Sequence, residues 1–89
     1  MTFAELIKDA RAGDPAALEL LLARYRPLAR HIAHGLLGAQ VGRRGDSSDI
    51  VQETMARAFN KIDDFRGTTE PEWIGWLRAI ITGEVARFI

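Results

Sequence analysis

Apolar residues recur at intervals of three and four along the stretch 46–67, DSSDIVQETMARAFNKIDDFRG. This spacing is typical of an α-helix that buries one stripe of its surface. The stripe consists of Ile50, Val51, Met55, Ala58, Phe59 and Ile62, and the opposite face carries Asp49, Gln52, Glu53, Arg57 and Asn60. A helix of this length is not stable alone in water, so the stripe must pack against other parts of the chain.

Residues that favour helix ends divide the first half of the chain into two further helices. Thr2 and Glu5 form a capping box, which predicts a short helix over about 3–12. Asp14 and Pro15 mark the start of a long second helix, because aspartate is a favoured N-cap and proline fits the first turn.

The long second helix is expected to bend or break at Pro27, since an interior proline removes one backbone hydrogen bond. The stretch 38–45, GAQVGRRG, holds three glycines and is predicted to be a mobile loop. Asp46 or Ser47 is predicted to cap the third helix, which extends to about residue 62.

The stretch 63–69, DDFRGTT, interrupts the helical spacing again and offers few apolar anchors besides Phe65, so we expect it to be mobile. Thr69 and Glu72 form a second capping box, which starts a fourth helix that continues to the last residue. No segment alternates apolar and polar residues as a half-buried strand does.

These elements predict an all-α fold, a small helical bundle of three to four helices. The 89 residues form one domain with one modest core, and the short helix lies within its first residues, 1–13. Tryptophans on the apolar side of a helix are most often core residues, which applies to Trp73 and Trp76. The residues expected to be buried together are Leu21, Tyr25, Ile50, Phe59, Trp76, Leu77 and Ile80.

The formal net charge is zero, but the two halves of the chain differ in sign. Residues 1–45 hold seven Lys or Arg against four Asp or Glu, and residues 46–89 hold five against eight. A free-standing DNA-binding protein would show a denser basic face, so any contact with nucleic acid needs help from a partner. The first residues are interrupted by charges and resemble neither a signal peptide nor a membrane span, which predicts a cytoplasmic protein without membrane association.

Catalysis and metal binding find little support in the sequence. His31 and His34 share one helix face, but no third metal ligand stands at a helical offset from them. The pair Asp63 and Asp64 lies in a predicted loop, where acids more often serve turns than acid–base chemistry. The chain has no cysteine. We therefore expect no enzyme activity, no metal and no cofactor.

Three segments in order resemble region 2 of the extracytoplasmic-function (ECF) sigma factors, which are bacterial transcription initiation subunits. They are DIVQETM at 49–55 with Ala58 and Phe59, the loop FRG at 65–67, and WIGWLRAI at 73–80. The stretch DPAALELLLARYRPLARHIAHGLLG also resembles the first helix of that region, so the resemblance spans about residues 14–89.

The resemblance implies two sites. The first is a docking face for the clamp helices of the RNA polymerase β′ subunit, and its matching residues are Asp49, Gln52, Glu53 and Arg57. The second holds the non-template strand of the melted minus-ten promoter element, and its candidates are Phe65, Arg66, Thr68, Thr69, Arg78 and Arg87. The resemblance also suggests an anti-sigma factor as a further partner.

Two observations leave alternatives open. Gly83 stands where the family commonly has asparagine, which removes a group that could contact a base edge. No region 4 is present in these 89 residues, so the sequence is either an isolated region 2 domain or part of a longer chain. A helical protein-interaction module that never binds DNA, such as an adaptor or an anti-activator partner, is the alternative function, and a stand-alone nucleic-acid binder is another.

Overall fold

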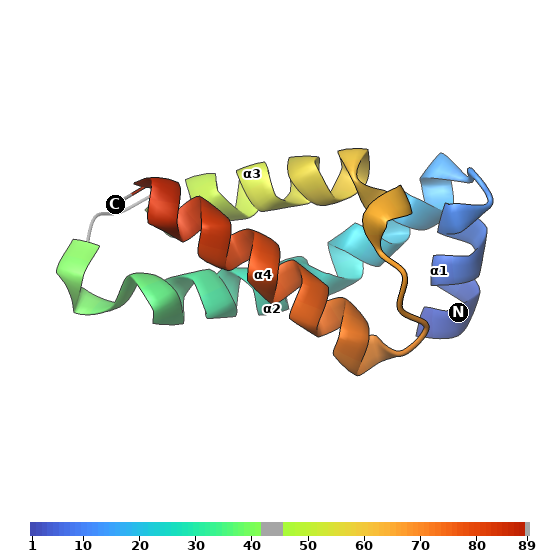
Figure 1. The fold of residues 1–89 in the computed structure, drawn as a ribbon, viewed down its shortest axis with the longest axis horizontal. Helices are drawn as coiled ribbons and strands as arrows, with labels where there is room; N and C mark the ends of the chain where they lie inside the picture. The colour runs from blue at the N-terminus through green and yellow to red at the C-terminus, as the bar shows by residue number, and fades with distance from the viewer. Residues whose placement is uncertain (42–45, 89) are drawn as a thin grey trace.

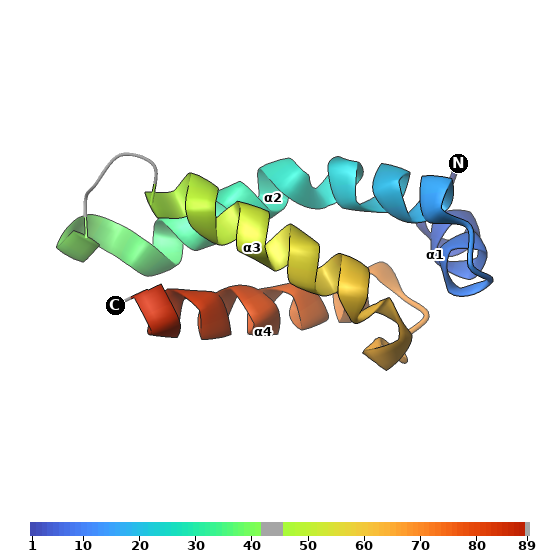
Figure 2. The same ribbon diagram turned by 90° about the horizontal axis from the view of Figure 1, so that it is seen from above.

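The computed structural model describes residues 1–41 and 46–88, with side chains for residues 1–38 and 48–87. It confirms an all-α bundle. The elements, in chain order, are α1 (Phe3–Arg11), α2 (Pro15–Val41), α3 (Asp46–Asn60), the 3₁₀ turn η1 (Ile62–Asp64) and α4 (Glu70–Phe88). Helices α2, α3 and α4 lie side by side along the 40 Å length of the molecule, and α1 packs across one end (Figures 1 and 2). No helix in the described part of the chain is long and apolar enough to cross a membrane.

The predicted helix starts are confirmed by their hydrogen bonds. At the first capping box the Thr2 amide donates to Glu5 Oε1 at 2.8 Å, and the Glu5 amide donates to Thr2 Oγ1 at 3.1 Å. Gly13 follows the end of α1 with φ 98°, a left-handed conformation that glycine adopts without strain. Asp14 Oδ1 then accepts from the Ala16 amide at 3.0 Å and caps α2.

At Pro27, where the sequence predicted a bend or a break, α2 does not break. α2 is helical through Pro27, and its non-helical residue is Gly38, with φ 59° and ψ −157°. An interior proline can remain in a helix when the surrounding packing offsets the lost hydrogen bond, and the neighbouring Ala29 is 1% exposed. Residues 42–45 of the predicted loop and the side chains of the predicted cap, Asp46 or Ser47, lie outside the described residues.

The core forms where the helical stripes meet. Four residues of the predicted set are buried as expected, namely Leu21, Tyr25, Ile50 and Leu77. Two others, Trp76 and Ile80, are partly buried and pack against the core. Trp73 is 0% exposed, which confirms its assignment to the core.

The burial predicted for Phe59 is wrong, because its side chain is 40% exposed. The centre of the α3 stripe is occupied instead by Thr54 and Ala58, both 0% exposed. At 3.6 residues per turn, Phe59 is rotated by about 100° from Ala58 and so lies at the edge of the stripe. Thr54 and Ala58, which are fully buried, are small residues, and the larger Phe59 ring remains partly exposed.

A partly buried hydrogen bond joins α2 to the start of α4. The Tyr25 hydroxyl donates to Glu70 Oε2. Burial raises the pKa of Tyr25 to about 12, and the hydrogen bond to the Glu70 carboxylate acts in the same direction. Tyr25 therefore remains a neutral donor at any ordinary pH and ties the two helices together.

We predict that Gly67→Ala destabilises the domain by about 1–3 kcal/mol, as an overpacked site does. A Cβ at this position would lie 2.8 Å from both Glu72 Cβ and Phe65 Cζ, so the segment between η1 and α4 would have to move. The measurement is the free energy of unfolding from urea titration followed by circular dichroism.

Gly75→Ala is the matched control for this substitution. Gly75 lies within α4 with nothing within 4 Å of its added Cβ, so alanine should stabilise the helix by about 0.5–1 kcal/mol. Equal effects of the two substitutions would show that the segment around Gly67 is not tightly packed.

Candidate functional site

The outer face of α3 carries three of the predicted docking residues. Asp49, Gln52 and Glu53 are all exposed, because the helix turns its Ile50 and Thr54 side toward the core. Among the described side chains, neither Asp49 nor Glu53 forms an ion pair. The structure thus brings these three residues together on one solvent-facing surface that accepts hydrogen bonds.

The fourth predicted docking residue, Arg57, forms an ion pair with α4 within the domain. Its Nε lies 2.7 Å from Glu84 Oε2 of α4, and its side chain is 32% exposed. Glu84 is buried, and Arg87 Nη1 lies 3.8 Å from the same oxygen. Sequence reasoning did not identify Glu84, because an acid in an amphipathic helix is usually solvated. Two arginines balance its buried charge, as a buried carboxylate requires.

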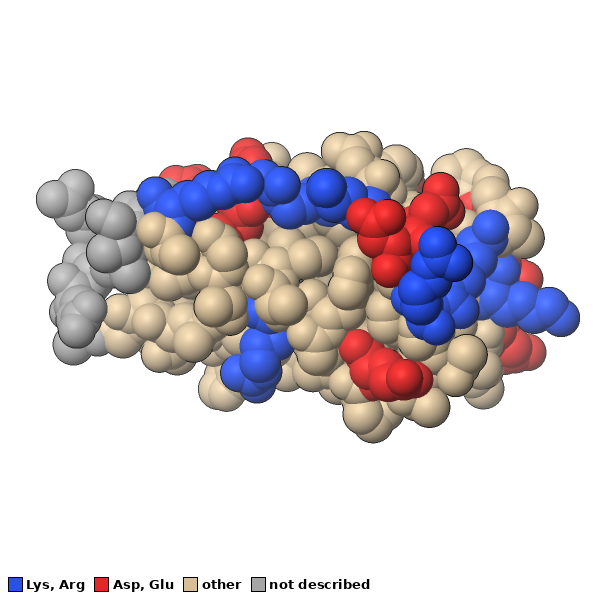
Figure 3. Space-filling model, viewed as in Figure 1, with Lys and Arg blue, Asp and Glu red and all other residues tan. Residues whose placement is uncertain are grey.

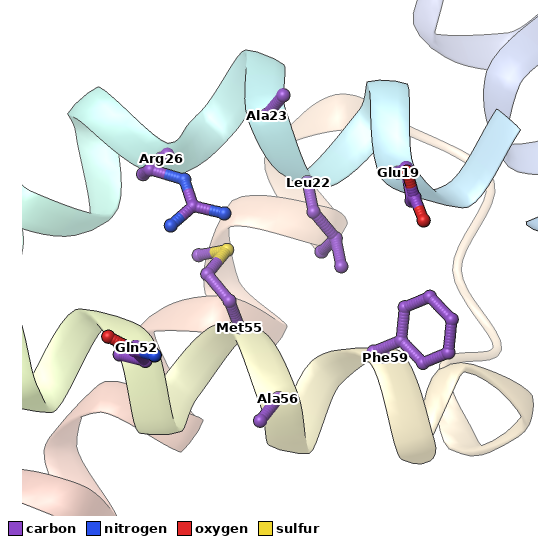
Figure 4. A pocket seen from close by; sticks show the side chains of 8 residues that line it. All are labelled: Glu19, Leu22, Ala23, Arg26, Gln52, Met55, Ala56 and Phe59. Carbon is purple, nitrogen blue, oxygen red and sulfur yellow. The ribbon is translucent and has the colours of Figure 1, made fainter. Parts of the chain in front are cut away.

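An open groove runs beside the α3 face, between α2 and α3 (Figure 4). Its volume is about 530 Å³, and its lining consists of Glu19, Leu22, Ala23, Arg26, Gln52, Met55, Ala56 and Phe59. Figure 4 shows the Phe59 ring on the side of Glu19, while Arg26 extends from α2 over Met55. The groove therefore combines an exposed aromatic ring with one charge of each sign, and it shares Gln52 with the polar face of α3.

Phe65, predicted to contact DNA, is buried. It is 4% exposed, and its ring centroid lies 5.3 Å from that of Trp73 and 5.5 Å from that of Trp76. In this structure the Phe65 ring cannot stack on a base, because protein side chains cover it. Phe65, which the sequence analysis named as the main apolar anchor of this segment, holds the segment onto α4.

Thr68 and Thr69 are exposed, and Glu72 organises both of them. Glu72 Oε1 accepts from the Thr68 amide at 3.0 Å, the Thr69 amide at 3.0 Å and the Thr69 hydroxyl at 2.9 Å. These hydrogen bonds, that from the Thr68 amide first, lower the pKa of Glu72. The arrangement confirms the second capping box and presents the two threonines at the N-terminal end of α4.

Arg11 of α1 contacts the segment 65–69, and the sequence analysis did not identify this contact. Its Nη2 donates to the Phe65 carbonyl at 2.7 Å and also to the Gly67 carbonyl. Its guanidinium carbon lies 4.9 Å from the centroid of the Phe65 ring, within the range of a cation–π contact. These partners are 54 and 56 positions away along the chain, so no local pattern indicates them.

The predicted DNA-contacting arginines do not share one surface. Arg66, Arg78 and Arg87 are all exposed. Arg66 lines an opening of about 470 Å³ with Arg11 and Asp63. Arg78 and Arg87 are nine residues apart on α4, about two and a half turns, so they lie on opposite flanks of the helix. Figure 3 shows the face of the molecule seen in Figure 1. Lys and Arg side chains form a band along this face, and further basic side chains lie apart from the band.

The histidine pair and the loop acids show no metal-binding arrangement. His31 and His34 are both exposed on α2. Within the described residues, no group of three or more His, Asp or Glu side chains is placed to hold a metal ion.

Comparison with known proteins identifies one family model, sigma-70 region 2, which matches residues 21–89. The ECF RNA polymerase sigma-E factor of Haemophilus influenzae is 32% identical over 89 residues, which are 100% of this chain and 43% of that protein. The ECF RNA polymerase sigma-E factors of Salmonella typhimurium and Escherichia coli are each 30% identical over 84 residues. Those 84 residues are 94% of this chain and 40% of each relative.

The chain thus spans about two fifths of the length of these relatives. No solved structure matches it. The family model covers α3, η1 and α4 entirely and all of α2 from Leu21 onward. The matched segment therefore includes the polar face of α3 and the segment 65–69, and the chain belongs to the sigma-70 region 2 family.

Proposed function

We propose that this chain is the part of a sigma factor that docks on the clamp helices of the RNA polymerase β′ subunit and binds the melted minus-ten element. The observation that carries the proposal is the exposed face of Asp49, Gln52 and Glu53, within the segment that the family model matches. These residues have an exposed, acceptor-rich surface without ion pairs among the described side chains.

The chemistry of this face suits a basic partner helix. Carboxylates accept charge-assisted hydrogen bonds from arginine and lysine, and the Gln52 amide both donates and accepts. The groove beside the face adds the exposed ring of Phe59, an apolar contact of the type that dominates binding energy at the centre of interfaces. Arg57 serves in this proposal at the margin, because its ion pair with Glu84 holds it toward α4.

We predict that Glu53→Lys weakens binding to the polymerase core by at least about tenfold at moderate salt, since it places a positive charge opposite a basic partner. The fold should be unaffected, because Glu53 is exposed and has no ion pair among the described side chains. Affinity is measured by titration of labelled chain with core polymerase.

Asp64→Lys is the control for Glu53→Lys, because it makes the same charge change at an exposed residue of η1, away from the α3 face. It should leave core affinity unchanged. If both variants bind core as the wild type does, the docking face lies elsewhere.

We predict that Phe59→Ala weakens core binding by about tenfold or more, as loss of a well-packed aromatic contact does. Its effect on stability should fall below the roughly 3–5 kcal/mol of a core Phe→Ala change, because the ring is already 40% exposed. Core titration and urea denaturation are measured on the same preparation. A variant that unfolds readily but still binds core would assign Phe59 to the fold and not to the interface.

We further propose that Arg66, Thr68 and Thr69 contact the unpaired non-template strand of promoter DNA. The Thr68 hydroxyl can bond a base edge, and the Arg66 guanidinium can stack on a base or contact a phosphate. The Thr69 hydroxyl donates to Glu72 Oε1, so towards a base it can act only as an acceptor. Arg78 and Arg87 can add phosphate contacts from the two flanks of α4. Phe65 acts in this proposal as the buried support of the segment.

We predict that Arg66→Ala lowers the affinity of the complex between this chain and core polymerase for an A/T-rich single-stranded oligonucleotide, by about three- to tenfold. The loss should shrink at high salt, because part of it is a phosphate contact. Fluorescence anisotropy of the labelled oligonucleotide measures it, and core affinity should be unchanged. If Arg66→Ala binds the oligonucleotide as tightly as the wild type does, the segment 65–69 is not part of the DNA-binding site.

A further inference from the structure

The segment 65–69 is held from three sides, although it has no regular secondary structure. Phe65 packs beneath it against Trp73, and the carboxylate of Glu72 binds the amides of Thr68 and Thr69 from the α4 side. The third support comes from α1, where Arg11 binds the carbonyls of Phe65 and Gly67.

Arg11 is suited to this contact in a way that few side chains are. One terminal nitrogen supplies two N–H groups, and each reaches one of the two carbonyls that flank Arg66. The guanidinium plane at the same time covers the Phe65 ring. Charge-assisted hydrogen bonds are stronger than neutral ones, so these contacts favour one conformation of the backbone on both sides of Arg66.

We infer that Arg11 is a positioning residue for nucleic-acid binding, which clasps the backbone on both sides of Arg66 and so directs Arg66 and Thr68 to the surface. This inference rests on the proposed function, because it assigns a purpose to the shape of the proposed DNA-binding segment. It also gives α1 a role, although α1 precedes the residues 21–89 that the family model matches.

The geometry favours a positioning role for Arg11 over that of one more phosphate contact. Both hydrogen bonds of Nη2 go to backbone carbonyls within the protein, and the side chain is partly buried. Arg11 therefore affects DNA binding indirectly, because its hydrogen bonds fix the backbone of the segment 65–69. The nearby Lys8 of α1 is exposed and has no such contact among the described residues.

The first measurement is amide hydrogen exchange in the 89-residue chain, comparing Arg11→Ala, Arg11→Lys and wild type. Loss of hydrogen bonds to a charged donor should speed exchange of the Thr68 and Thr69 amides by about tenfold in Arg11→Ala. Arg24→Ala is the matched control, because Arg24 also donates from Nη2 to a backbone carbonyl, that of Met1, at 2.6 Å. Equal exchange rates at Thr68 and Thr69 in Arg11→Ala and in Arg24→Ala would show that Arg11 does not hold this segment, and would overturn the inference.

The second measurement is affinity of the polymerase complex for the A/T-rich oligonucleotide. Arg11→Ala should reduce it by about as much as Arg66→Ala does, with core affinity unchanged. Arg11→Lys keeps the charge but lacks the planar group that covers Phe65, so it should behave as Arg11→Ala does. Full rescue by lysine would show that Arg11 acts through its charge alone and would overturn the positioning role.

The two measurements separate this inference from the proposed function. If the wild-type complex does not bind the oligonucleotide at all, the proposed DNA function fails and the positioning role fails with it. If the wild type binds, Arg66→Ala weakens binding and Arg11→Ala does not, the DNA function stands and the positioning role of Arg11 is overturned.

Discussion

The packing of Trp73 is the interaction on which the rest of this structure depends. Its indole is 0% exposed, and the rings of Phe3, Tyr25, Phe65 and Trp76 surround it with centroids between 5.3 and 6.1 Å away. Edge-on and tilted aromatic contacts at such distances are favourable beyond the area that they bury. These rings come from α1, α2, α4 and the segment before α4, so Trp73 joins four parts of the chain at the end of the bundle where α1 lies (Figure 1).

The two edges of α3 have different partners, and this division explains the proposed docking face. At one edge, Arg57 is paired with the buried Glu84 of α4, so that edge is used within the molecule. At the other edge, Phe59 remains exposed beside the groove to α2, and the outward face between them carries Asp49, Gln52 and Glu53. One edge of α3 thus contacts α4 within the domain, and the other edge and the outward face leave a mixed polar and aromatic surface for a partner.

Much of the fold could be predicted from local patterns, because helix ends depend on residues close in sequence. The capping boxes at Thr2 and Thr69 and the cap at Asp14 form as expected. Phe59 could not be placed, since periodicity identifies a stripe but not which of its members faces the nearest helix. The interruption at Gly38 instead of Pro27 has a similar cause, because tertiary packing decides whether a helix tolerates an interior proline.

The sequence by itself determined the four helices, their apolar stripes and membership of the sigma-70 region 2 family, because all three are written in the order and spacing of neighbouring residues. Only the tertiary structure decided the setting of the candidate sites. It buried Phe65 and brought Arg11 to the carbonyls of Phe65 and Gly67. The physical reason is separation along the chain: a contact across more than fifty residues depends on how the helices pack, and no local spacing encodes that packing.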